Sequence, residues 1–295
     1  MRDTALSPVV ARWELARRLR QRRLGLGIGA ASITKALDVS SAYWSHIENE
    51  RNLLPEDKLD QLLEVLEIDD AERAELQELR EVAKERGWWA RYTALFDDEL
   101  LRYYGLESGA VAVRTYEGVF MPGLLQGEEY IRALMVSAAA TIPAIEIEQR
   151  VAVRLRRQQR LDGDDRLRLV VVIGEAALVQ QFGGPGVLHR QLRHLAEVVR
   201  SHPDNVDLRV IPFTSSNILG GTTFHLLDFA SPHLPTLAWY ESTVFGDLLV
   251  DDLDRKETRV RDLRFLHDHA LDLALDRDAS LTLIDEAAAR LESSL

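Results

Sequence analysis

The chain has 295 residues, a formal net charge of −12 and no cysteine, so disulfides and thiolate metal sites are excluded. Its length favours two domains over one, and its 46% apolar content is ordinary for a globular protein. The longest strongly apolar run, residues 169–173, is too short to cross a bilayer, and no secretion signal follows Arg2. We therefore expect a cytoplasmic protein with no membrane-spanning segment.

After a short N-terminal arm, a helix is predicted from Val10 to Arg23. Its apolar residues Trp13, Ala16 and Leu19 recur every three positions, and its charged residues are six arginines and a single glutamate. This helix is the most basic segment in the first part of the chain.

Two short helices joined by a three-residue turn are predicted between Leu24 and Pro55. Val39 is the apolar residue of the turn, and Ser40 is suited to cap the second helix through its hydroxyl. A pair of helices crossing at such a turn can place one of them in the major groove of DNA. Apolar residues recur at the spacing of one helical face in both helices: Ile33, Ala36 and Leu37 in the first, and Tyr43, Trp44 and Ile47 in the second.

This segment resembles the XRE-type (lambda-repressor-like) helix-turn-helix family through Val39-Ser40, the run from Ser45 to Asn49, and Arg51. The resemblance implies that the second helix reads DNA, with some residues facing base edges and others touching phosphates. Two positions depart from the family: Ala30 replaces a phosphate-binding polar residue, and Glu50 replaces a glycine. By position, Ser41, Ala42, Ser45 and His46 would face the bases, and Asn49 and Arg51 the phosphates.

Sequence-specific DNA binding is the leading hypothesis for this segment, and a helical domain that binds protein is the alternative. Residues 1–51 carry a charge of +4 and the remainder −16. Because attraction to phosphate acts over about 8–10 Å at physiological salt, a local basic surface can function on an acidic protein. The acidic remainder would repel DNA and suppress nonspecific binding.

Further helices follow the proposed DNA-binding segment. Pro55 suits a helix start, and Leu59, Leu62, Leu63 and Leu66 form one apolar stripe. Asp69 and Glu72 have the spacing of a capping box that opens another helix, acidic on its outer face. We predict an all-α helix-turn-helix domain of four or five short helices at residues 9–68, a bridging helix at 69–86, and a mixed α/β domain at 87–295.

The predicted C-terminal domain alternates strands and helices. The β-prone run from Leu167 to Ile173 is expected to be a strand buried on both faces. The strands predicted at residues 237–241 and 247–250 are expected to pair as a hairpin. Further strands are predicted at 208–213 and 222–229, and helices at 128–136, 146–159, 175–181, 187–200, 255–273 and 280–291.

A series of short motifs in this part, each weak alone, resembles the actinobacterial WhiJ-like or antitoxin-like transcriptional regulators in order and spacing. The resemblance implies a cytoplasmic regulator, often encoded beside a small acidic partner protein, whose C-terminal domain has no settled catalytic role. The motifs occupy residues 87–89, 116–117, 122–126, 154–159, 174–178, 183–185 and 210–213.

The search for chemistry in this domain predicts no catalytic residue, no cofactor and no metal. His267 and His269 point about 200° apart on a helix and so cannot easily share a metal. Glu175 and Asp251 follow strand ends, where ligand sites often lie, but capping of the next helix is the favoured reading. A basic cluster at residues 150–160 is read as a solvated face, with binding of nucleic acid or an acidic partner as the alternative.

We expect a transcriptional regulator, not an enzyme, that binds double-stranded DNA at a palindromic operator as a homodimer and acts as a repressor. Its C-terminal domain would dimerise and receive a signal from a small acidic partner protein. The alternative is a one-component sensor whose C-terminal domain binds a small molecule or has enzymatic activity, with a polar, concave site near Glu175 and Asp251.

Overall fold

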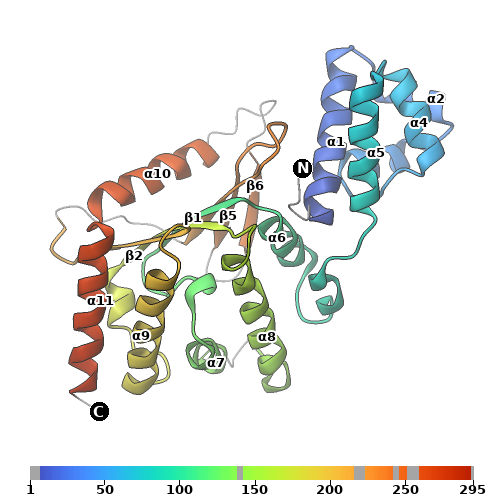
Figure 1. Ribbon diagram of the computed structural model, residues 1–295. Coiled ribbons are helices and arrows are strands. Elements are labelled where there is room, and N and C mark those ends of the chain that lie inside the picture. Colours follow the sequence, from blue (N-terminus) through green and yellow to red (C-terminus); the bar gives the residue numbers. More distant parts are fainter. Residues whose placement is uncertain (1–6, 138–141, 216–222, 242–245, 251–258, 294–295) are drawn as a thin grey trace. The chain divides into compact units, whose positions relative to one another are not determined.

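The computed structural model describes residues 7–137, 142–215, 223–241, 246–250 and 259–293, and these fall into two compact units (Figure 1). The first unit comprises the chain up to Arg91 together with Ser231–Leu234, and the second comprises the remainder. A helical N-terminal region and a mixed α/β C-terminal domain confirm the predicted fold class.

The first unit contains five α-helices in its described residues. Helix α5 packs along α1, and its Leu76, Leu79 and Ala83 join the same apolar core as Ile33 and Trp44. The segment predicted to bridge two domains therefore lies within the first unit. The helices are α1 (Pro8–Gly25), α2 (Ala30–Leu37), α3 (Ser41–Glu48), α4 (Glu56–Val65) and α5 (Asp70–Ala83), followed by a 3-10 turn at Trp88–Tyr92.

The second unit is built on a six-stranded sheet with the order β3-β2-β1-β4-β5-β6. The three strands β1, β2 and β3 are parallel, whereas β4, β5 and β6 alternate in direction from β1 outward. The predicted hairpin is confirmed, with Leu237 opposite Val250. The strands are β1 (Ala112–Glu117), β2 (Arg168–Gly174), β3 (Val206–Ile211), β4 (Phe224–Asp228), β5 (Leu237–Glu241) and β6 (Gly246–Val250).

Helices cover both faces of this sheet (Figure 1). Helix α10 crosses one face, where Val260, Leu263 and Ala270 pack on Tyr116 and Val172. The remaining helices lie on the other face, and α9 and α11 pack against each other there. The helices are α6 (Asp98–Ser108), α7 (Glu128–Ser137), α8 (Ile147–Gln158), α9 (Pro185–Ser201), α10 (Arg259–Leu273) and α11 (Arg277–Glu292).

Three elements differ from the prediction. Strand β1 at the centre of the sheet and helix α6 before it were not predicted. The helix predicted at residues 175–181 is only a 3-10 turn at Glu175–Leu178. The first residues of the helix predicted at 255–273 lie outside the described part of the chain, and its described part begins at Arg259.

Candidate nucleic-acid interface

The turn between α2 and α3 is fixed by two local features. Asp38 ends α2 in the left-handed region with φ 51°, and the Val39 N–H donates to the Thr34 carbonyl at 3.0 Å. The hydroxyl of Ser40 then accepts a hydrogen bond from the Tyr43 N–H at 3.1 Å, as its predicted capping role requires. Together these bonds set the point at which the chain leaves α2 and starts α3.

Helix α3 is held by its buried face. Ile33, Leu37, Trp44 and Ile47 are buried in the shared core, whereas Ala36, predicted on the same apolar face, is exposed. Because Trp44 and Ile47 bury one face of α3, the opposite face of this helix is exposed to solvent.

Arg23 of α1 connects α3 to the segment that precedes α2. Its Nε donates to Glu48 Oε1 at 2.9 Å, and its Nη1 donates to the Ile28 carbonyl at 2.7 Å. Arg23 is buried, so this ion pair is shielded from solvent. Arg23 is thus a positioning residue for the recognition helix, and the sequence alone did not identify it.

The end of α3 adopts a Schellman arrangement. The Arg51 N–H donates to the His46 carbonyl at 2.8 Å, and the Glu50 N–H donates to the Ile47 carbonyl at 3.1 Å. Glu50 itself has φ 60°, a conformation that glycine adopts most easily. The departure from the family glycine therefore falls where the backbone is strained.

All six residues proposed to contact DNA are exposed in the first unit. Asn49 differs from its expected role in one respect, because its Nδ2 donates to the Ser45 carbonyl at 2.7 Å and to Ser45 Oγ at 3.2 Å. Asn49 thus caps the end of α3 and orients Ser45. The exposed residues are Ser41, Ala42, Ser45, His46, Asn49 and Arg51.

The arginines of α1 do not form the basic surface that their number suggested, because several bind groups inside the first unit. Arg12 donates to the Ala83 carbonyl, Arg18 to Glu72 and Glu75, and Arg22 to the carbonyls of Leu66 and Glu67. These arginines fasten α1 to α4 and α5. These arginines contribute to the +4 charge of residues 1–51, but their guanidinium groups donate to carbonyls and carboxylates of the same unit.

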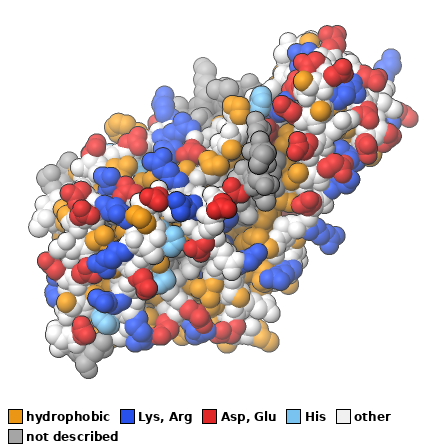
Figure 2. All heavy atoms as spheres, in the orientation of Figure 1, with side chains coloured by type: hydrophobic (Ala, Val, Ile, Leu, Met, Phe, Trp, Pro, Cys, Tyr) orange, Lys and Arg blue, Asp and Glu red, His pale blue; other side chains and the backbone are white. Residues whose placement is uncertain are grey.

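Within residues 24–52, all of which are described, only Lys35 and Arg51 are Lys or Arg residues. Both are exposed, and neither side chain makes a hydrogen bond or ion pair in the described part of the protein. Figure 2 shows basic and acidic side chains interspersed over the visible face of the molecule. Residues 24–52 also carry Asp38, Glu48 and Glu50, so this segment has no excess positive charge of its own.

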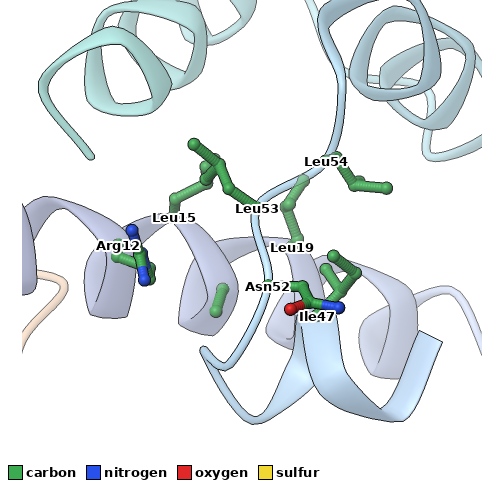
Figure 3. A pocket seen from close by; sticks show the side chains of 8 residues that line it. Arg12, Leu15, Leu19, Ile47, Asn52, Leu53 and Leu54 are labelled. Carbon is green, nitrogen blue, oxygen red and sulfur yellow. The ribbon is translucent and has the colours of Figure 1, made fainter. Parts of the chain in front are cut away.

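A cavity of about 10 Å³ lies between α1 and the segment after α3 (Figure 3). Six of its eight lining residues are apolar, four of them leucines, and Arg12 and Asn52 supply its polar groups. This volume corresponds to about one water molecule. The cavity is a packing gap between α1 and the chain that follows the recognition helix and has no room for a ligand.

Most arginines of the basic cluster at residues 150–160 also bind groups within the fold. The cluster is therefore neither the solvated face nor the partner-binding surface that the sequence suggested. Arg150 donates to Glu146 and to the Leu95 carbonyl, Arg154 to Gln126, and Arg160 to the Ala110 carbonyl. Arg157 forms a buried double hydrogen bond with Glu107. Arg156, whose described partner is Gln159, is the exposed member of the cluster.

These bonds explain why two of the C-terminal motifs occur together. Gln158 of α8 donates to the carbonyls of Gly123 and Gln126, and Gln126 in turn donates to the Met121 carbonyl at 2.6 Å. The motif at residues 154–159 thus fastens the motif at residues 122–126 beneath the sheet. These hydrogen bonds give the spacing of the two motifs a structural reason.

The candidate ligand edge near Glu175 is partly outside the described residues, because Asp251 lies there. The Glu175 carboxylate accepts a hydrogen bond from the Phe213 N–H at 2.7 Å, so it fastens the chain after β3 to the end of β2. No group of three or more His, Asp or Glu residues that could hold a metal occurs among the described residues. No helix in that part of the chain is long and apolar enough to span a bilayer.

Ser201, His202 and Asp162 contact one another in the order Ser–His–Asp, as in the catalytic triads of hydrolases. Their hydrogen bonds, however, are those of side chains at the end of a helix. His202 Nδ1 is 2.9 Å from both Ser201 Oγ and the Val198 carbonyl oxygen, and Nε2 is 3.0 Å from Asp162 Oδ1. The Ser201 hydroxyl donates to the Glu197 carbonyl at 2.9 Å. The Ser201 hydroxyl proton is therefore donated to the backbone of α9. Ser201 and His202 thus form the C-terminal end of this helix.

The fold and the exposed α3 surface define a helix-turn-helix protein, the class typical of DNA-binding regulators. Residues 14–76 match the model of the family described as "Helix-turn-helix domain". Residues 100–286, more than half of the chain, match the model described as "Domain of unknown function (DUF5753)", and the chain belongs to this family. No curated protein and no solved structure gives a significant match.

Proposed function

We propose that the protein is a sequence-specific transcriptional repressor that reads a palindromic operator as a homodimer. The observation that carries the DNA-reading role is the exposed small polar face of α3, held by the Ser40 cap and by Arg23. Ser41, Ser45 and His46 offer hydroxyl and imidazole groups to base edges, and Ala42 lets the helix approach closely. A symmetric dimer would bind half-sites about one helical turn, 10–10.5 base pairs, apart.

The C-terminal domain, in this proposal, dimerises and receives a signal from a small acidic partner protein, and it acts by binding and not by catalysis. Support for this part comes from the motif resemblance. Co-expression with the product of an adjacent gene tests it, because a stable complex that alters operator affinity is expected. A partner that neither copurifies nor changes affinity would contradict it.

Base reading is tested by selecting bound duplexes from a random library with the wild-type protein and with His46→Ala. We expect loss of His46 to relax the preference at one base pair by about 1–3 kcal/mol. Arg51→Ala, as the matched phosphate-contact variant, should weaken all sites alike. If both variants lose affinity without any change in preference, α3 does not read the bases in this way.

The small number of unpaired cations near α3 predicts a weak dependence of DNA binding on salt. Lys35 and Arg51 together would release about two counterions, so log K should fall with log salt at a slope of about −2 per domain and about −4 per dimer. Fluorescence anisotropy of an operator duplex over a potassium chloride series measures this slope. A much steeper slope would show that more cations contact phosphate than Lys35 and Arg51, either exposed Arg20 of α1 or arginines assigned here to internal bonds.

Replacing Glu50 with glycine should increase both stability and DNA affinity. The left-handed conformation costs a residue with a Cβ about 1 kcal/mol, and the carboxylate stands next to the proposed phosphate contacts. Glu67→Gly is the matched control, because Glu67 follows the end of α4 with φ 51° and is not among the residues proposed to contact DNA. Thermal unfolding should show a gain for both variants, and binding assays a gain for Glu50→Gly alone; equal affinities for the two variants would remove Glu50 from the interface.

A further inference from the structure

A hollow of about 290 Å³ lies beside β3, the edge strand of the sheet in the second unit. Its wall is formed by the start of β2, by residues 203–207 and Arg209, and by Arg277 at the start of α11. Neither the DNA-reading helix nor the candidate edge at Glu175 contributes to it. The proposed DNA-binding function therefore does not involve this hollow.

Three arginines and two aspartates line this hollow, but the aspartates have cations of their own. Asp207 pairs with Arg209 at 3.0 Å, and Asp204 pairs with Arg166, which stands outside the lining, at 3.2 Å. The two other lining arginines, Arg168 and Arg277, face no carboxylate partner among the described residues. The hollow is thus locally positive on a chain whose net charge is −12.

The two remaining arginines have unused donors. Arg168 is exposed, and its side chain makes no hydrogen bond or ion pair in the described part of the chain. Arg277 donates from Nη2 to the Val199 carbonyl at 2.5 Å, while its Nε is buried without a hydrogen-bond partner. Four other arginine Nε atoms of the described residues are also buried without a partner, so this atom does not mark the site. The donors of Arg277 left for a ligand are those of Nη1, which makes no hydrogen bond in the described part of the chain.

The surroundings of the hollow are already fixed by hydrogen bonds. Buried Asn205 donates from Nδ2 to the carbonyls of Leu161 and Leu167, at 3.1 and 3.0 Å. The Val210 N–H donates to Ser280 Oγ at 2.9 Å, which holds α11 against the outer edge of β3. Binding there would require little ordering of the backbone, so most of the interaction energy would appear as affinity.

We propose that this hollow binds a small ligand that carries a phosphate group, with Arg168 and Arg277 as the residues that recognise it. Guanidinium groups offer planar, paired donors that match phosphate oxygens, and they stay charged at every physiological pH. The volume is close to the lower end of ligand sites, about 300 Å³, which suits a sugar phosphate or a nucleoside monophosphate. The site goes beyond the proposed reading of DNA and gives the second unit a ligand of its own.

Calorimetry on the full chain without DNA tests the site, with adenosine 5′-monophosphate and ribose 5-phosphate as probes and adenosine as the uncharged control. We expect both phosphorylated probes to bind and adenosine not to bind. Arg168→Ala should weaken binding at least about tenfold through loss of a charge-assisted hydrogen bond. Because Arg168 has no internal partner, this variant should fold normally, and its unfolding temperature checks that it does.

Arg193→Ala is the matched control, since Arg193 is an exposed arginine of α9 outside the hollow. It should leave affinity for both probes unchanged. Absence of binding by the wild-type chain, or equal weakening in the two variants, would overturn the proposal. A loss of operator affinity in Arg168→Ala without any loss of probe binding would also overturn it, because the phosphate contacted would then be that of DNA. The calorimetric outcomes do not depend on base reading by His46, so failure of this site and failure of the proposed DNA reading can be distinguished.

Discussion

Replacement of Arg157 with methionine is expected to destabilise the second unit by about 3–5 kcal/mol, because it leaves the Glu107 carboxylate buried without its cation. Nε and Nη2 of Arg157 donate to the two carboxylate oxygens of Glu107, each at 2.7 Å. The side chain of Glu107 is only 3% exposed, so water cannot replace the missing partner. The hydroxyl of Tyr103 donates to the same carboxylate at 3.0 Å and would remain its one described donor.

The guanidinium of Arg157 is itself enclosed by aromatic rings, with its Cζ 4.9 Å from the centre of the Tyr104 ring. Burial alone lowers the pKa of Arg157, but the charge and hydrogen bonds of Glu107 outweigh burial and raise that pKa well above its ordinary value. The arginine therefore remains charged, and Glu107→Gln should also be strongly destabilising. Chemical denaturation followed by circular dichroism measures both changes.

Two further variants separate the buried pair from ordinary surface charge. Arg190→Ala removes an exposed pair with Glu129 and should cost less than about 1 kcal/mol. The double variant Arg157→Met with Glu107→Leu removes both buried charges and should recover much of the loss. A single Arg157→Met variant as stable as Arg190→Ala would mean that the pair is not buried as described.

Acidification should destabilise the second unit through His267. His267 is a residue of α10 whose side chain is 0% exposed, and neither ring nitrogen makes a hydrogen bond of good geometry. Burial is the largest cause that lowers the pKa of His267, to about 4, and Arg114 acts in the same direction. The nearby Asp268, Asp228 and Val170 backbone oppose this shift in part.

The sign follows from proton binding. Between about pH 6.5, the ordinary histidine pKa, and pH 4, the unfolded chain binds a proton at this position that the folded protein excludes. Stability contributed by the neutral ring is therefore complete above that window and is lost as the pH falls through it. The difference in pKa corresponds to about 3 kcal/mol.

Carboxylates also contribute to acid unfolding, so the effect of His267 is measured by comparing variants with the wild type. The free energy of unfolding of His267→Phe should fall less steeply between neutral pH and about pH 4 than that of the wild type. His269→Gln, on the same helix but half-exposed, should keep the wild-type slope. Parallel curves for His267→Phe and the wild type would show that His267 takes up no proton during acid unfolding.

The parts of the fold that were predicted from the sequence are those with a strong local signal. The caps at Ser40 and Asp69, the leucine stripe of α4 and the apolar run of β2 all act over a few residues, and each lies where expected. Strand β1 escaped prediction because Arg114 and Thr115 interrupt its apolar pattern. Its Arg114 is accommodated by an ion pair with Asp228 of β4, a partner that no local window contains.

The same reason explains why the roles of the arginines were not predicted. Sequence reveals how many charges a helix carries, but an arginine's partner can lie far away in the chain: Arg18 binds Glu72, and Arg157 binds Glu107. The exposure of α3 was predictable from periodicity. The sequence did not predict that the arginines of α1 would form internal bonds and so leave little basic surface near α3.

The sheet order has a consequence for how the chain folds as it leaves the ribosome. The helices of the first unit are contiguous and make short-range contacts, so they can assemble soon after synthesis of the first 91 residues. Central β1 must wait, since its neighbours β2 and β4 are translated much later. During that interval both hydrogen-bonding edges of a nascent strand stand open, and the growing polypeptide is most vulnerable to mispairing with other chains.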